Sequence, residues 1–119
     1  PAFLSGAIGL LMPIDWPEPF GLVMIEAMSC GTPVIAFNRG SVPEVIEDGL
    51  TGFIVEDEAA AIAAVERLGR LDRATVRARF EQRFTACRMA QDYVTIYHRL
   101  AAADRPVVRR RLQLVGSAR

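Results

Sequence analysis

Three short apolar runs divide the first half of the chain. They occupy residues 7–12, 34–37 and 53–55, and glycine, proline or polar residues bound each of them. Continuous apolar character over so few residues is typical of strands that are buried on both faces. Because helix-like segments separate the runs, the pattern predicts an α/β fold in which the three strands are parallel neighbours.

Helical spacing of apolar residues follows the first two runs. Residues 21–30 are predicted to form a helix between the first and second strands. Ser41 and Glu44 lie three positions apart, which is the spacing of a capping box. They predict a short helix over residues 43–47.

Three further helices are expected in the second half of the chain, with Asp57, Asp72 and Thr85 as their N-caps. Each should pack through one apolar face. The faces consist of Ile62, Val65 and Leu68 in the first of these helices, Val76 and Phe80 in the second, and Met89, Tyr93, Ile96, Tyr97 and Leu100 in the third. Pro106 interrupts the helical pattern, so we assign residues 1–103 to one domain and residues 104–119 to a tail.

Basic residues are concentrated in the second half of a chain that carries no net charge. Residues 1–60 contain nine acidic residues and one basic residue, Arg39, whereas residues 61–119 contain thirteen arginines and five acidic residues. Most of these arginines alternate with acidic and apolar positions at helical spacing, which is typical of solvated helix faces. The densest cluster, residues 109–111, lacks the interleaved aromatic residues of single-strand binders, so we do not expect nucleic acid as a partner.

The sequence also argues against a metal site and a disulfide. Cys30 and Cys87 lie in apolar helical segments without CxxC spacing, and His98 is the only histidine. Buried free cysteines suit a reducing compartment, which favours a cytoplasmic location. The apolar run near the start of the chain is too short to span a bilayer.

Residues 18–34, EPFGLVMIEAMSCGTPV, combine an apolar helix with a single acidic side chain. Nearly every side of this predicted helix carries hydrophobic residues, so we expect the helix to be buried. Glu26 is the exception. A buried carboxylate is costly unless polar groups meet it, and a pair of ligand hydroxyls would do so. The alternative is that Glu26 bonds to neighbouring protein groups.

The start of the same helix is suited to an anion. Phe20, Gly21 and Leu22 would present backbone N–H groups without helical acceptors, and Gly21 has no side chain to block close approach. Glu18 precedes them at the carboxyl end of a strand, where doubly wound folds bind ligands. The alternative is that Glu18 is a solvated loop acid.

Glu18 and Glu26, separated by seven residues, form an E-x7-E pattern that P-E-V-I and D-G-x-T-G-F follow. With these motifs, residues 1–100 resemble the retaining glycosyltransferase family 4 (group 1), whose members have the two-domain GT-B architecture. The resemblance implies a Rossmann-like parallel sheet with flanking helices. This would be the partial carboxyl-terminal domain that binds the nucleotide-sugar donor.

The resemblance also implies roles for the candidate residues. Glu18 would be the catalytic residue beside the transferred sugar, Glu26 would bind the ribose, and backbone amides of Phe20, Gly21 and Leu22 would hold sugar and diphosphate. Transfer would proceed with retention from a UDP- or GDP-linked donor to a carbohydrate or lipid-linked glycan, without metal or cofactor. The enzyme would be cytoplasmic, or peripheral at the inner face of the membrane.

Two departures from the family pattern limit these expectations. Gly40 and Ser41 stand where the family usually has paired glycines, and the chain has no lysine. The family's basic diphosphate-binding residues and its acceptor domain lie upstream of the matching segment. We therefore expect a missing amino-terminal domain, an inactive chain when alone, and self-association through an uncovered strand edge.

Of three alternatives, the sequence disfavours one and leaves two open. Glycogen phosphorylase shares the GT-B architecture but needs a lysine for pyridoxal phosphate, which this chain does not offer. Glycogen or starch synthase has a similar E-x7-E region, so the class of acceptor is undecided. The non-enzymatic alternative is a degenerate sugar-nucleotide-binding or assembly module.

Overall fold

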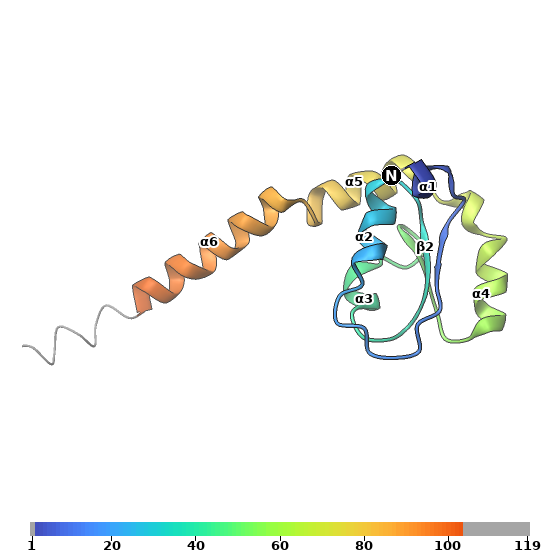
Figure 1. Ribbon diagram of the computed structural model, residues 1–119, viewed down its shortest axis with the longest axis horizontal. Coiled ribbons are helices and arrows are strands. Elements are labelled where there is room, and N and C mark those ends of the chain that lie inside the picture. The colour runs from blue at the N-terminus through green and yellow to red at the C-terminus, as the bar shows by residue number, and fades with distance from the viewer. Residues whose placement is uncertain (1, 104–119) are drawn as a thin grey trace, which may run out of the picture. The chain divides into compact units, whose positions relative to one another are not determined.

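The computed structural model describes residues 2–103, and the chain divides into two compact units, Pro1–Phe84 and Thr85–Arg119 (Figure 1). The first unit contains α1 (Ala2–Gly6), β1 (Leu10–Met12), α2 (Leu22–Ser29), β2 (Val34–Phe37), α3 (Val42–Val45), β3 (Gly52–Val55), α4 (Glu58–Val65), a 3-10 turn η1 (Leu68–Arg70) and α5 (Arg73–Arg83). The second contains α6 (Ala86–Ala103). The predicted tail, residues 104–119, lies outside the described residues.

The three strands form one parallel sheet in the order β1-β2-β3, which confirms the predicted topology. In the register of the sheet, Leu10 lies opposite Val34 and Val34 lies opposite Gly52. The first strand is shorter than predicted, because residues 7–9 connect α1 to β1. α1 was not predicted, because a five-residue helix is too short to show an apolar period.

Two apolar clusters cover the two faces of the sheet. On one face, Met24 and Met28 of α2 and Val76 of α5 are fully buried against β2. On the other face, α4 packs over Ile35 and Phe53. Figure 1 shows α2 and α4 on opposite sides of β2. Consecutive strand residues point to opposite faces, so β2 contributes to both clusters.

Asp57 and Asp72 cap α4 and α5, as predicted. Asp57 Oδ1 accepts a hydrogen bond from the N–H of Ala60 at 2.8 Å. The Asp72 carboxylate accepts from the N–H groups of Ala74 at 3.2 Å and Thr75 at 3.0 Å. Both aspartates satisfy donors that have no acceptor within their own helix.

The capping box predicted at Ser41 and Glu44 is wrong. α3 begins at Val42, and the Ser41 side chain makes no cap hydrogen bond. Ser41 has helical dihedral angles, φ −75° and ψ −8°, instead of the extended conformation from which a serine reaches back to its helix. Its hydroxyl donates to the carbonyl oxygen of Phe20 at 2.8 Å, in a distant loop.

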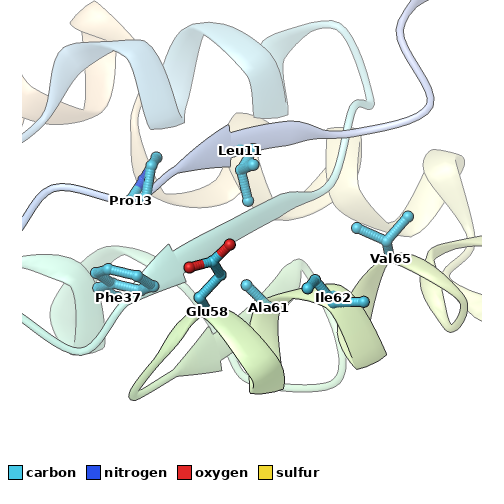
Figure 2. A pocket seen from close by; sticks show the side chains of 7 residues that line it. All are labelled: Leu11, Pro13, Phe37, Glu58, Ala61, Ile62 and Val65. Atoms are coloured by element: carbon cyan, nitrogen blue, oxygen red, sulfur yellow. The ribbon is translucent and has the colours of Figure 1, made fainter.

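The predicted apolar face of α4 is partly wrong. Leu68 is buried, but Ile62 and Val65 are 62% and 44% exposed. The buried residues of α4 are Ala61 and Ala64. The small alanine side chains form the face that meets the sheet, and the larger residues are turned aside. Ile62 and Val65 point into an open groove of about 320 Å³ beside Leu11 of β1 (Figure 2).

Arg73, at the start of α5, hydrogen-bonds to other segments of the chain, whereas the sequence predicts a solvated residue. The Arg73 guanidinium donates to the carbonyl oxygens of Ala7 at 2.7 Å and Ser5 at 2.9 Å, and to the hydroxyl of Thr32 at 2.8 Å. Thr32, fully buried, donates in turn to the carbonyl of Leu4 at 2.7 Å. These bonds tie α1 to the turn that follows α2.

The second unit contains the predicted amphipathic helix. Thr85 Oγ1 accepts from the N–H of Arg88 at 3.2 Å, which confirms Thr85 as the cap of α6. The residues of its predicted apolar face are all exposed in the described part of the chain: Met89, Tyr93, Ile96, Tyr97 and Leu100. Cys87 is also exposed and Cys30 is half-buried, so neither is the fully buried thiol expected. Within residues 2–103, no helix is both long and apolar enough to cross a membrane.

We predict a pH-dependent contribution of Asp72 to stability. Hydrogen bonds from the Thr75 hydroxyl and from the N–H groups of Ala74 and Thr75 lower the pKa of Asp72 below its ordinary value of 3.8. A carboxyl with a lowered folded-state pKa stabilises the fold above pH 3.8, and this contribution is lost as the pH falls through the folded-state pKa. Asp72→Asn should therefore lower the urea midpoint at neutral pH and differ less from wild type below pH 3.8. A difference that does not change with pH would contradict this assignment.

Candidate active site

Glu18 lies in the loop that joins β1 to α2, and the loop holds its side chain at both oxygens. Oε1 accepts a hydrogen bond from the N–H of Gly21 at 3.1 Å, and Oε2 accepts one from the indole N–H of Trp16 at 3.0 Å. Glu18 is half-buried, so it is not simply a solvated acid. Glu18 was predicted from the sequence but Trp16 was not, because an isolated aromatic residue in a loop gives no periodic signal.

The turn that follows β2 presses against the backbone of Glu18. A Cβ added to Gly40 would lie 2.3 Å from the Glu18 carbonyl oxygen and 2.7 Å from the carbonyl carbon of Pro17, so only glycine fits there. Gly40 also has a φ of +53°, in the left-handed region that favours glycine. Ser41 donates its N–H to the Glu18 carbonyl at 2.9 Å and its hydroxyl to the Phe20 carbonyl at 2.8 Å.

The predicted anion-binding amides lie at the start of α2. Gly21 is the N-cap, in the left-handed conformation, and Leu22 is the first helical residue, whose N–H has no acceptor within the helix. The Gly21 N–H is bonded to Glu18, so a ligand at this amide would share it with the carboxylate. The structure therefore brings Glu18, Gly21 and Leu22 together. The ring of Phe20 packs edge-on against Phe84, with centroids 6.4 Å apart.

Glu26 is exposed, so the prediction of a buried carboxylate is wrong. α2 is covered on one face only: its buried residues are Met24, Ala27 and Met28. Leu22, Val23 and Glu26 lie on the uncovered face, where a carboxylate stays hydrated and needs no protein partner. Glu26 borders a hollow of about 280 Å³, whose other lining residues are Leu4, Ser29 and Cys30.

Arg39 is a residue of this region to which the sequence analysis gave no role. Its guanidinium pairs with Asp15 at 3.0 Å, from the loop that carries Glu18, and with Glu56 at 3.4 Å, beyond the end of β3. Asn38 donates to the same Glu56 at 2.8 Å. The first basic residue of the sequence thus links the loops that follow all three strands. A single arginine after a strand does not reveal from the sequence which carboxylates it will pair with.

We predict that the close approach at Gly40 supports the Glu18 loop. Gly40→Ala combines a left-handed alanine with a backbone clash and should cost about 2–4 kcal/mol of unfolding free energy. Gly49→Ala is the matched control, because Gly49 also has a positive φ, +74°, but has nothing within 4 Å of the added methyl group. It should cost about 1 kcal/mol. Urea unfolding followed by the emission of Trp16, the only tryptophan, measures both; equal losses would contradict the clash.

Comparison with known proteins identifies the family of the chain. The profile of the family described as glycosyl transferases group 1 matches residues 1–83. N-acetyl-alpha-D-glucosaminyl L-malate synthase of Bacillus anthracis is 33% identical over 104 residues, which cover 81% of this chain and 27% of that protein. Alpha-maltose-1-phosphate synthase of Mycobacterium tuberculosis (strain ATCC 25618 / H37Rv) is 45% identical over 56 residues, which cover 47% of this chain and 14% of that protein.

Solved structures match the fold. Sucrose-phosphate synthase from Thermosynechococcus elongatus is 36% identical with a TM-score of 0.69, over 86% of this chain and 27% of that one. HepE of Anabaena, solved in complex with UDP-glucose, is 25% identical with a TM-score of 0.68, over 81% of this chain and 29% of that one. The chain thus spans less than a third of each of these relatives, and the predicted α/β class, part of a GT-B glycosyltransferase, is confirmed. The chain belongs to the glycosyl transferases of group 1.

Proposed function

We propose that the chain is part of the donor-binding domain of a retaining family 4 glycosyltransferase, with the E-x7-E motif as its donor site. The observation that carries the proposal is the placement of the two carboxylates along α2. Glu18 is oriented at the start of the helix, and Glu26 borders a hollow farther along it. A nucleotide-sugar laid along the helix would meet one carboxylate at each end.

The proposed roles follow from this arrangement. The transferred sugar lies against Glu18, the diphosphate lies at the amides of Phe20, Gly21 and Leu22, and the ribose hydroxyls donate to Glu26. A carboxylate has about four acceptor positions, so the two hydrogen bonds that Glu18 already accepts leave room for sugar hydroxyls. The HepE structure contains UDP-glucose, which supports a UDP-linked donor; a GDP-linked donor is the other candidate.

The proposed mechanism is electrostatic. As the bond between sugar and diphosphate breaks, negative charge accumulates on the leaving diphosphate. Backbone N–H groups at the start of α2 stabilise that charge, together with the positive end of the helix dipole. Transfer with retention, to a carbohydrate or lipid-linked glycan, requires neither metal nor cofactor. The proposed location is cytoplasmic, peripheral at the inner membrane face for a lipid-linked acceptor.

The kinetic consequences test these roles in the full-length protein. Glu18→Gln should lower kcat by about 100-fold, because this carboxylate meets the reacting sugar. Glu26→Ala should chiefly raise KM for the donor, by about ten-fold, because charged hydrogen bonds to the ribose are lost. Both would be measured as sugar transfer from UDP- and GDP-linked donors. Unchanged kinetics in both variants would show that the carboxylates serve only the fold.

The chain alone should be inactive and should self-associate. Among the described residues, β1 pairs only with β2, so its outer edge has unpaired backbone groups. The groove beside that edge is apolar, with Leu11, Ile62 and Val65 exposed (Figure 2). Light scattering of the purified chain and assays with both donor classes test the two expectations. A compact monomer would contradict the first, and measurable transfer would contradict the second.

A further inference from the structure

We infer that Ser41 is a positioning residue for the Glu18 carboxylate, and that it acts through a single peptide group. This inference rests on the proposed function, in which Glu18 meets the transferred sugar. Ser41 lies outside the E-x7-E segment, on the turn between β2 and α3.

The peptide group between Phe20 and Gly21 is held at both of its polar ends. Its carbonyl oxygen accepts the Ser41 hydroxyl at 2.8 Å, and its N–H donates to Glu18 Oε1 at 3.1 Å. A peptide group is planar, so fixing the direction of the carbonyl fixes the direction of the N–H. The Ser41 hydroxyl therefore determines where the amide that holds Glu18 points.

The Ser41 hydroxyl does not serve as the cap of α3. The residue is only 6% exposed, and it stands at the start of α3 without making a cap hydrogen bond. A buried hydroxyl needs a partner, and the Phe20 carbonyl, across the loop, is that partner. α3 therefore does not depend on this side chain for its first turn.

The conformation of Gly21 makes the restraint necessary. Gly21 has φ 71° and ψ 65°, and glycine reaches regions of dihedral space on either side of that value at little cost. Without the Ser41 hydroxyl, the Phe20–Gly21 peptide can rotate about the flanking bonds and turn its N–H away from Glu18. The carboxylate would then keep only the Trp16 hydrogen bond and sample more than one orientation.

A double-mutant cycle in the full-length protein tests the coupling. Ser41→Ala alone should lower kcat by about ten-fold, with KM for the donor changed less than about two-fold, because one orienting hydrogen bond is lost. In a Glu18→Gln background the same substitution should have almost no further effect on kcat, because the group that it positions is already disabled. Equal effects in both backgrounds would overturn the inference, since a variant that merely misfolds loses activity in both.

One further measurement, with a control variant, completes the test. In the 119-residue chain, Ser41→Ala should make Trp16 more accessible to acrylamide quenching, because the loop that carries it is freed. Ser5→Ala is the matched control, because it removes one hydroxyl that donates to the Ala2 carbonyl at 3.1 Å, away from this loop. It should change neither kcat nor the quenching of Trp16. Unchanged quenching in Ser41→Ala would overturn the inference. If Glu18→Gln itself leaves kcat unchanged, the proposed function fails instead, which separates the two ideas.

Discussion

The contact between the Gly40 turn and the backbone of Glu18 is the constraint on which the site depends. Two loops that follow different strands meet there at a distance that admits no side chain. Parallel strands bring the loops at their carboxyl ends to the same edge of the sheet, but they do not decide how close those loops come. The absence of a side chain at Gly40 allows the short distance between the loops. The hydrogen bonds of Ser41 can form only because the two backbones are already in contact.

Much of the fold could be predicted because it obeys local rules. β2 is a fully apolar run between turn residues, and its bounds were predicted without error. Asp57 and Asp72 follow the capping preference of their residue type. Ser41 matches the same sequence preference but does not cap its helix. Its hydroxyl donates instead to the Phe20 carbonyl, a partner from a distant loop that no local sequence pattern reveals.

The errors about burial share a different cause. Periodicity shows which residues of a helix lie on one face, but not how many faces are covered. α2 is apolar nearly all round, yet only its Met24, Ala27 and Met28 face is covered in the described part of the chain, so Glu26 is exposed. α4 meets the sheet through alanines, and its larger Ile62 and Val65 border the groove instead. Ile62 and Val65 were predicted to be core residues because they are large and apolar. The helix approaches the sheet so closely that only the small side chains of Ala61 and Ala64 fit between them.

One wall of the hollow beside Glu26 is held by polar contacts in addition to its packing against the apolar core. That wall is Leu4, on a helix without a fully buried residue, and its carbonyl is bound by Thr32, which Arg73 binds in turn. α5, in a part of the chain remote from the E-x7-E segment, therefore helps to hold this wall in place. In the proposed function Glu26 meets the ribose. Variation at position 73 would then alter the space beside Glu26 while leaving every residue of the motif unchanged, so related chains with identical motifs need not accept the same nucleoside.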